Sequence, residues 1–255
     1  MKKAMLVVVF TGFSVVPLWG QDIPLAKILV AREGWHEAAK GVKGITFLDA
    51  EPSGDVAIYT GERTHVLRSG DKLEKLRLPP AIIPPKDYQT VKTRAGARYQ
   101  LDKDRKVVEV SIGKKKVVLK LPGLRAPNCL ASWPDEGHLV IGESDGAYLW
   151  AVRIEKDGSL GPGDRYYSLR VRKGERLPVT AITMDASYLL YACTPLGVQV
   201  FDPTGRLSGV IAMPSKETMT AITIGGAKAD TLFVAAGDRI WARRIMGKAA
   251  YTIKK

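Results

Sequence analysis

The tetrapeptide Thr180-Ala181-Ile182-Thr183 recurs unchanged forty residues later as Thr220-Ala221-Ile222-Thr223. Each copy is followed by an apolar run, a turn containing glycine and a second apolar run, at residues 189–192 and 198–201 in the first unit. A period of about forty residues with several short strands is typical of β-propeller blades, which bury their faces only against neighbouring blades. The repeat therefore predicts an all-β fold, a β-propeller of four-stranded blades.

Five units of this kind can be placed along the chain. Their innermost strands are predicted to begin near Gly44, Tyr88, Asn128, Thr180 and Thr220. The last unit shows no clear fourth strand, and residues 34–40 form a free strand that can supply it. Closing the ring with strands from both ends of the chain removes exposed sheet edges. Trp150 and Trp241 share the third-strand position of their units, so we expect both to be largely buried between or beneath the sheets.

The first twenty residues differ from the repeats. Lys2 and Lys3 precede an apolar stretch that Pro17 ends, and Gly20 is a small residue suited to cleavage. This pattern is typical of a secretory signal peptide. The alternative, a membrane anchor, requires ~20 apolar residues, more than are present. We expect residues 1–20 to be removed and residues 21–255 to form a single β-propeller domain in the periplasm or outside the cell.

The formal net charge of +13 favours anionic partners through long-range attraction that salt weakens. We expect a small-molecule or glycan ligand of anionic character. The basic residues are scattered over predicted turns, as in Lys114-Lys115-Lys116, where charge is usually only solvated. The sequence therefore predicts no nucleic-acid partner, no stable membrane insertion and a monomer.

Two motif matches fail on their context. Residues 142–146 fit the Gly-x-Ser-x-Gly pattern of a nucleophile elbow, but that elbow joins a strand to a helix and another strand is predicted here from Tyr148. The histidines His36, His65 and His138 are isolated from other ligands at metal-binding spacing, which argues against a zinc site.

The chain has two cysteines, Cys129 and Cys193. A disulfide persists in an exported protein, but the predicted register places the Cα atoms beyond the ~7 Å limit for a bridge. We expect two small buried side chains, although sequence leaves their redox state open.

Several phrases carry a family resemblance. They are Pro127-Asn128-Cys129, Asp157-Gly158-Ser159-Leu160, the stretch 196–203 with Gln199-Val200-Phe201-Asp202-Pro203, and the stretch 231–238 ending in Ala236-Gly237-Asp238. With these phrases the chain resembles the senescence marker protein/gluconolactonase family, calcium-dependent lactonases that include regucalcin, and in particular its exported bacterial members. The resemblance implies six blades and one divalent cation on the central axis.

The resemblance also implies which residues would hold that cation. Asn128 matches the asparagine ligand of the family, whereas Thr180 stands at the aspartate position. The glutamate position falls on Gly44, or on Lys43 if one residue is gapped. The family's substrate-binding asparagine falls on Tyr88, with Gln89 beside it. The two anionic ligands are thus replaced, and one of the six units, between Leu78 and Lys86, is missing.

A calcium site needs 6–8 oxygen ligands with carboxylates among them, and the family's reaction needs the metal as electrophile and the aspartate to activate water. We therefore predict a degenerate member with no catalytic residue, no metal ligand set and no cofactor. The candidate residues of a metal-free axial pocket are Asn128, Thr180, Lys43, Gly44, Tyr88, Gln89 and Thr220.

Two function classes remain at this point. The first is a non-catalytic exported propeller that binds a ligand or partner. The second is a lactonase that uses calcium or another divalent cation, with a carboxylate supplied by Asp49, Glu51 or Asp87. Each candidate also has a structural explanation. Asn128 can cap a turn, and the repeated threonines suit blade packing.

Overall fold

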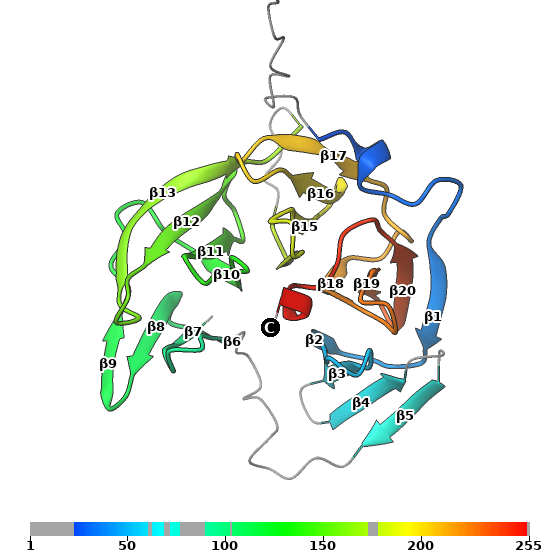
Figure 1. The fold of residues 1–255 in the computed structure, drawn as a ribbon, viewed down its shortest axis with the longest axis horizontal. Coiled ribbons are helices and arrows are strands. Elements are labelled where there is room, and N and C mark those ends of the chain that lie inside the picture. The colour runs from blue at the N-terminus through cyan, green and yellow to red at the C-terminus, as the bar shows by residue number, and fades with distance from the viewer. Residues whose placement is uncertain are drawn as a thin grey trace, which may run out of the picture.

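The computed structural model describes residues 23–60, 63–68, 72–76, 90–102, 104–172 and 178–253. The expectations for residues 1–20, Tyr88, Gln89 and Asp87 lie outside these residues. Five four-stranded antiparallel sheets form a ring around a common centre (Figure 1). The predicted all-β propeller with five blades is confirmed.

Each blade is numbered by its place in the chain, with the innermost strand given first. Blade 1 consists of β2 (Ile45–Ala50), β3 (Val56–Thr60), β4 (Arg63–Arg68) and β5 (Lys72–Leu76). Blade 2 consists of β6 (Thr90–Lys92), β7 (Arg98–Asp102), β8 (Val107–Ile112) and β9 (Lys115–Val118). Blade 3 consists of β10 (Pro127–Ser132), β11 (His138–Glu143), β12 (Tyr148–Ile154) and β13 (Leu160–Ser168). Blade 4 consists of β14 (Ala181–Met184), β15 (Leu190–Thr194), β16 (Gly197–Phe201) and β17 (Leu207–Ile211). The innermost strands begin within two residues of the predicted positions.

Blade 5 joins the two ends of the chain. It consists of β18 (Met219–Gly225), β19 (Thr231–Ala236), β20 (Arg239–Arg244) and β1 (His36–Lys40). β1 pairs antiparallel with β20, so the predicted contribution of residues 34–40 is confirmed. Before β1, the short helix η1 (Leu25–Lys27) packs near β17, and Ile28 O accepts a 2.7 Å hydrogen bond from Met246 N.

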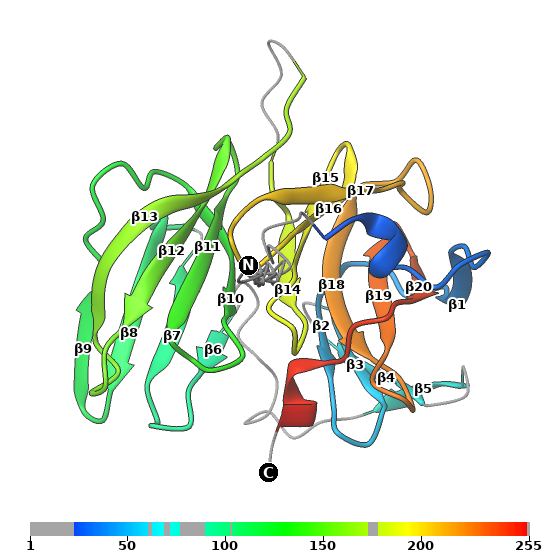
Figure 2. The same ribbon diagram turned by 45° about the horizontal axis from the view of Figure 1, so that its top comes forward.

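The two ends of the ring are different. We call the end where the innermost strands begin the strand-start face and the opposite end the strand-end face. The C-terminal helix η2 (Ala250–Ile253) lies at the centre of the ring (Figure 1) and on the strand-end face (Figure 2). Asp185, just after β14, forms a β-bridge with Ala249. The chain's own C-terminal segment therefore covers the axis on the strand-end face.

Hydrophobic side chains fill four of the five junctions between blades. The buried clusters join blades 2 and 3 (Tyr99 with Leu139), 3 and 4 (Leu149 with Phe201), 4 and 5 (Tyr191 with Val234), and 5 and 1 (Leu48 with Phe233). Within the described parts of the chain, no such cluster joins blades 1 and 2. This is the junction where the sequence lacks one unit of the family pattern.

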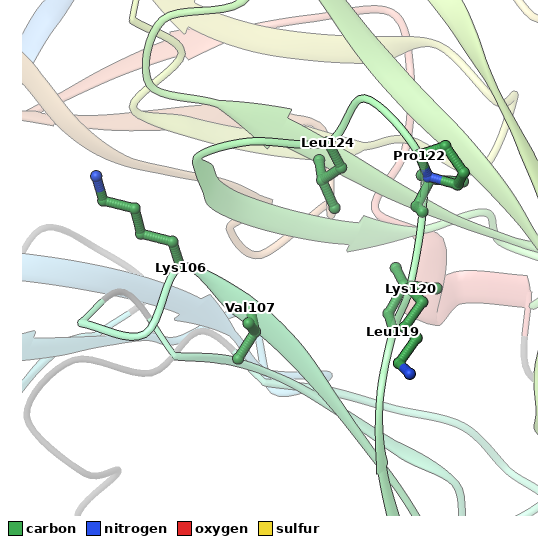
Figure 3. Close-up of a pocket in the computed structure, with 7 residues that line it drawn as sticks. Lys106, Val107, Leu119, Lys120, Pro122 and Leu124 are labelled. Atoms are coloured by element: carbon green, nitrogen blue, oxygen red, sulfur yellow. The ribbon is translucent and has the colours of Figure 1, made fainter.

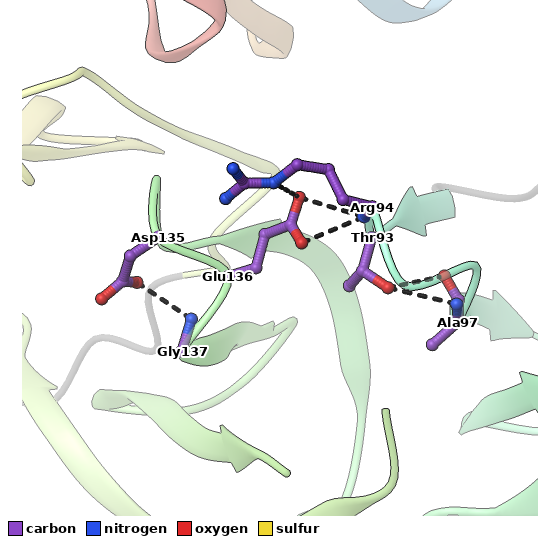
Figure 4. A network of polar contacts seen from close by, with 6 residues as sticks. All are labelled: Thr93, Arg94, Ala97, Asp135, Glu136 and Gly137. Atoms are coloured by element: carbon purple, nitrogen blue, oxygen red, sulfur yellow. Dashed lines mark hydrogen bonds and ion pairs between the residues drawn. The ribbon is translucent and has the colours of Figure 1, made fainter. Parts of the chain in front are cut away.

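Hydrogen bonds between two turns join blades 2 and 3 on the strand-end face (Figure 4). The Glu136 carboxylate accepts hydrogen bonds of 3.0 and 3.2 Å from the backbone nitrogen of Arg94 and one of 3.1 Å from its Nε. In the same turns, Thr93 Oγ1 accepts from Ala97 N at 3.1 Å and Asp135 Oδ1 accepts from Gly137 N at 2.9 Å. The turns after β6 and β10 thus hold each other in place.

The two third-strand tryptophans are buried to different extents. Trp150 is 5% exposed, as predicted, and the Gly123 segment and the Arg165 guanidinium, 5.3 Å from the ring centroid, cover it. Trp241 packs against the cluster between blades 4 and 5 but is only partly buried. Trp241 is therefore less buried than Trp150, although its Nε1 is enclosed.

Candidate functional site

Asn128 lies on the strand-start face at the beginning of β10. A β-bulge between Pro127 and Cys129 leaves Asn128 out of the ladder with β11. Its Nδ2 donates a 2.7 Å hydrogen bond to the carbonyl of Val179, the residue before Thr180. Asn128 and Thr180 therefore lie side by side, as the repeat register requires. The side-chain nitrogen of Asn128 thus links blade 3 to blade 4, and its side-chain oxygen Oδ1 remains the atom available to a ligand.

The same bulge recurs in other blades. In blade 5 the register shifts between Met219 and Ala221, at Thr220, and in blade 1 it shifts between Ile45 and Phe47, at Thr46. In blade 4, Thr180 N donates to Cys193 O although Cys193 already pairs with Ala181. Bulges are common beside functional sites because they redirect a side chain. The sequence pattern gave no indication of them.

These bulges identify Thr46 as the residue of blade 1 that is equivalent to Asn128. A backbone hydrogen bond of 2.9 to 3.0 Å closes the turn after the innermost strand in three blades. The donors and acceptors are Trp133 N and His138 O, Asp185 N and Leu189 O, and Glu51 N and Asp55 O. Five residues before these closing residues stand Asn128, Thr180 and Thr46. The prediction that Gly44 or Lys43 occupies this position is therefore corrected, because Glu51, and not Asp49, is the counterpart of Asp185.

The threonine hydroxyls at these positions are neutral and mostly point into their own blades. Thr46 Oγ1 donates to Tyr59 O at 3.3 Å, and Thr180 Oγ1 donates to Cys193 O at 3.4 Å. Thr220 Oγ1 is buried and has no hydrogen-bond partner among the described residues. Since buried polar groups are nearly always paired, Thr220 carries an unsatisfied hydroxyl at this position.

The other predicted pocket residues border the site. Lys43 and Gly44 are exposed just before β2, and Gly44 has a φ of +70°. A Cβ on Gly44 would meet nothing within 4 Å, so the start of β2 faces open space. The exposed Lys43 ammonium therefore makes the charge at this edge of the site positive.

The carboxylates considered as replacement ligands lie farther along blade 1. Asp49 and Glu51 follow Thr46 by three and five residues, roughly 10 and 16 Å at ~3.3 Å per strand residue. The surrounding protein desolvates the Asp49 carboxylate and raises its pKa, Glu51 adds to this effect, and Lys92 opposes it. Both groups therefore lie toward the strand-end face and away from Asn128.

The donors that the structure describes at the strand-start face do not fit a calcium ion. Asn128, Thr180, Thr46 and Thr220 offer one amide oxygen and three hydroxyls, with no charge to offset dehydration of the cation. Across the part of the chain that the structure describes, no three histidine, cysteine, aspartate or glutamate side chains are grouped so as to hold a metal ion. Among the described residues at this face, the side chains offer neutral hydrogen-bonding groups.

Glu143 is a buried carboxylate near this face that the sequence interpretation passed over. Its Oε1 accepts a 2.7 Å hydrogen bond from Arg125 N, and its Oε2 accepts a 2.8 Å hydrogen bond from Trp150 Nε1. These bonds hold the chain where it enters β10, so the carboxylate has a positioning role. Glu143 ends β11, and β12 follows at Tyr148, which confirms that residues 142–146 form no strand-to-helix elbow.

Both cysteines are free and fully buried. Burial raises the pKa of the Cys193 thiol, and Cys129 nearby adds to the increase. Because the thiolate is the reactive form, the Cys193 thiol is poorly reactive, and both cysteines are small buried side chains, as predicted.

A hollow of about 400 Å³ lies away from the axis, at the outer edge of blade 2 (Figure 3). It is lined by Lys106, Val107, Leu119, Lys120, Leu121, Pro122 and Leu124. The hollow contains none of the predicted pocket residues, so it is separate from the strand-start face.

Comparison with known proteins agrees with this geometry. The family model described as SMP-30/gluconolactonase/LRE-like region matches residues 56–238. The chain belongs to this family. A comparison with curated protein sequences finds no match.

Solved structures of SMP-30/gluconolactonase-like proteins share the fold. Regucalcin from Agrobacterium tumefaciens is 13% identical with a TM-score of 0.67, covering 85% of this chain and 95% of its own. A gluconolactonase from Xanthomonas campestris is 20% identical with a TM-score of 0.52, covering 78% and 71%. A luciferin-regenerating enzyme is 14% identical with a TM-score of 0.53, covering 83% and 80%. At these identities the likeness concerns the fold.

Proposed function

We propose that this SMP-30/gluconolactonase-like protein is an exported, non-catalytic propeller that binds a small polar or anionic ligand at its strand-start face without a metal ion. One observation carries the proposal. The positions equivalent to Asn128 in blades 1, 4 and 5 are all threonines, at Thr46, Thr180 and Thr220. At the positions where carboxylates would place negative charge on the axis, this chain has threonine hydroxyls.

The missing charge removes the chemistry of lactone hydrolysis. Hydrolysis needs an electrophile to polarise the carbonyl and a base to activate water. A threonine hydroxyl that donates to a backbone carbonyl, as Thr180 does, has neither role at neutral pH. We therefore expect binding without turnover.

The remaining groups favour a polar ligand that carries negative charge. Asn128 Oδ1 is a hydrogen-bond acceptor, and Lys43 supplies a cation at the edge. The C-terminal segment covers the opposite end of the axis, so a ligand would enter from the strand-start face.

Export is the second part of the proposal. It is supported by the charged and apolar pattern of residues 1–20. No helix within the described ranges is long and apolar enough to cross a membrane. We expect a monomeric mature protein that begins near Gln21.

Family membership favours one alternative, a lactonase with a rearranged metal site. Asp49 and Glu51 lie too far along blade 1 to join Asn128, which leaves Asp87, outside the described residues, of the three carboxylates considered. Calcium or another divalent cation would then be the cofactor.

Elemental analysis of the purified mature protein, combined with an aldonolactone hydrolysis assay, tests the proposal. Substoichiometric divalent metal and no turnover above the spontaneous rate are expected. Stoichiometric metal with turnover that Asp87→Asn abolishes would establish the alternative.

A further inference from the structure

Blade 2 has one face that differs from those of the other blades. Elsewhere both faces of the central strands are buried, as shown by the consecutive residues Leu139, Val140 and Ile141 in β11, each 0% exposed. In blade 2, burial alternates along the strands. Tyr99, Leu101, Val108 and Val110 pack against blade 3, and the residues between them are polar. Such alternation is typical of a sheet with one solvated face.

The register shows which residues make up the solvated face. One row across the four strands consists of Lys92, Arg98, Ser111 and Lys116, and the next consists of Thr90, Gln100, Glu109 and Val118. Leu119 N donates to Val108 O at 2.9 Å, which continues the ladder and places Lys120 opposite Val107. We call these residues the blade 2 outer face. It is turned toward the junction with blade 1, the one without a described hydrophobic cluster.

The charge of the blade 2 outer face is positive and largely uncompensated. Lys92, Arg98, Lys116 and Lys120 are exposed, and none forms an ion pair with a carboxylate of the described residues. The carboxylate Glu109 is already engaged by Arg105. Lys92 at the inner end is partly offset by Asp49, because the Lys92 cation opposes the rise in the Asp49 pKa that burial causes. Arg98, Lys116 and Lys120 therefore carry the free charge.

The geometry points to an extended polyanion as the ligand of this face. At ~4.8 Å between strands, the row from Lys92 to Lys116 spans roughly 14 Å. Cations held at that spacing on a rigid sheet match a chain with repeated negative charges better than a single small anion. The face continues outward into the hollow of Figure 3, where Lys106 and Lys120 stand on either side.

We infer that the blade 2 outer face binds an acidic polysaccharide. Nucleic-acid surfaces for single strands add aromatic side chains for base stacking, and the face has none. A membrane-binding surface adds large apolar side chains that enter the lipid interface, whereas the apolar residues of this face are the short Val107 and Val118, and its other neutral residues are Thr90, Gln100 and Ser111. Hydroxyl and amide groups between cations suit a hydroxyl-rich polyanion.

The test uses the mature protein and immobilised polygalacturonate, with affinity measured at about 50 and 200 mM NaCl. The triple variant Arg98→Glu/Lys116→Glu/Lys120→Glu is compared with Lys40→Glu/Lys156→Glu/Lys216→Glu, which makes the same charge change at exposed lysines elsewhere. We expect binding that weakens with salt, and a loss of about ten-fold or more in the first variant against about three-fold or less in the control.

Two further measurements make the outcome decisive. The neutral variant Arg98→Gln/Lys116→Gln/Lys120→Gln should also lose affinity while keeping the wild-type melting temperature, which separates lost binding from a disturbed blade. Equal losses in the test and control variants, or no wild-type binding at the lower salt, would overturn the inference. Tighter binding of duplex DNA or phosphatidylserine vesicles than of polygalacturonate would overturn it as well.

Discussion

Trp150→Ala should be among the most destabilising single substitutions in this propeller. The Trp150 ring is 5% exposed between the cluster of blades 2 and 3 and the Arg165 guanidinium. Its Nε1 also donates the 2.8 Å hydrogen bond that satisfies Glu143 Oε2. The substitution therefore removes a large buried side chain and leaves a buried carboxylate oxygen without its donor.

The magnitude follows from these two losses. Truncating a buried tryptophan to alanine costs about 3–5 kcal/mol, and an unsatisfied buried acceptor costs about 1–3 kcal/mol more. Since neighbouring effects are not additive, we expect about 4–6 kcal/mol in the free energy of unfolding. For a chain of this size each kcal/mol lowers the melting temperature by about 2–4 °C, so the fall should be roughly 10–20 °C.

Urea unfolding and calorimetry of three variants test this reasoning. Trp150→Phe retains an aromatic ring and loses the hydrogen bond, so it should cost about 1–3 kcal/mol. Trp241→Ala changes the same strand position in blade 5. There the ring is only partly buried, and its Nε1 has no hydrogen-bond partner among the described residues. This substitution should therefore cost about 2–3 kcal/mol. A Trp241→Ala cost equal to or above that of Trp150→Ala would refute the account of burial.

Three further predictions concern turns and the strand-end face. Glu136→Ala should lower the free energy of unfolding by about 1–2 kcal/mol, because it removes the acceptor of the Arg94 backbone nitrogen. Arg94→Ala removes only an exposed ion pair, so it should cost less than about 1 kcal/mol. Urea titrations measure both changes. Burial raises the pKa of the Asp185 carboxyl above its ordinary 3.8. The folded state therefore binds the carboxyl proton more tightly than the unfolded state does. The free energy of unfolding accordingly falls as the pH rises from below 3.8 through the folded pKa. The melting temperature of Asp185→Asn should therefore depend less on pH over that acidic range, and an unchanged pH profile would contradict the assignment. Gly197→Ala places a methyl group against the carbonyl of Ile211 at a φ of +125° and should cost about 2 kcal/mol or more in thermal unfolding, while a neutral result would show that the β15–β16 turn can relax.

The fold could be predicted because the repeat and the burial pattern are local properties of the chain. The identical stretches beginning at Thr180 and Thr220 fixed the register of two blades, and the period extended it to the strand starts near Gly44 and Asn128. The use of residues 34–40 followed from the missing strand of blade 5. Burial of individual side chains was less predictable, since Trp241 differs from Trp150 through neighbours that are distant in sequence.

The candidate site could be predicted only in part. Asn128 was found because it belongs to a continuous phrase, and its position beside Thr180 follows from the register. Thr46 was missed because Asp49 was taken as the counterpart of Asp185, whereas the equivalent turn of blade 1 is closed by Glu51. The blade 2 outer face was not visible either, because its cations are separated in sequence and the pairing of four strands aligns them.

Calcium-dependent thermal stability tests the central claim most directly. The melting temperature is measured with and without about 5 mM calcium for the mature protein, for Thr46→Glu/Thr180→Asp, and for the isosteric neutral pair Thr46→Gln/Thr180→Asn. The account predicts no change for the unmodified protein or the neutral pair, and a rise of about 5–10 °C for the charged pair if calcium reaches about 100 times its dissociation constant. A calcium-dependent rise in the unmodified protein would contradict the claim that the axial site has lost its metal.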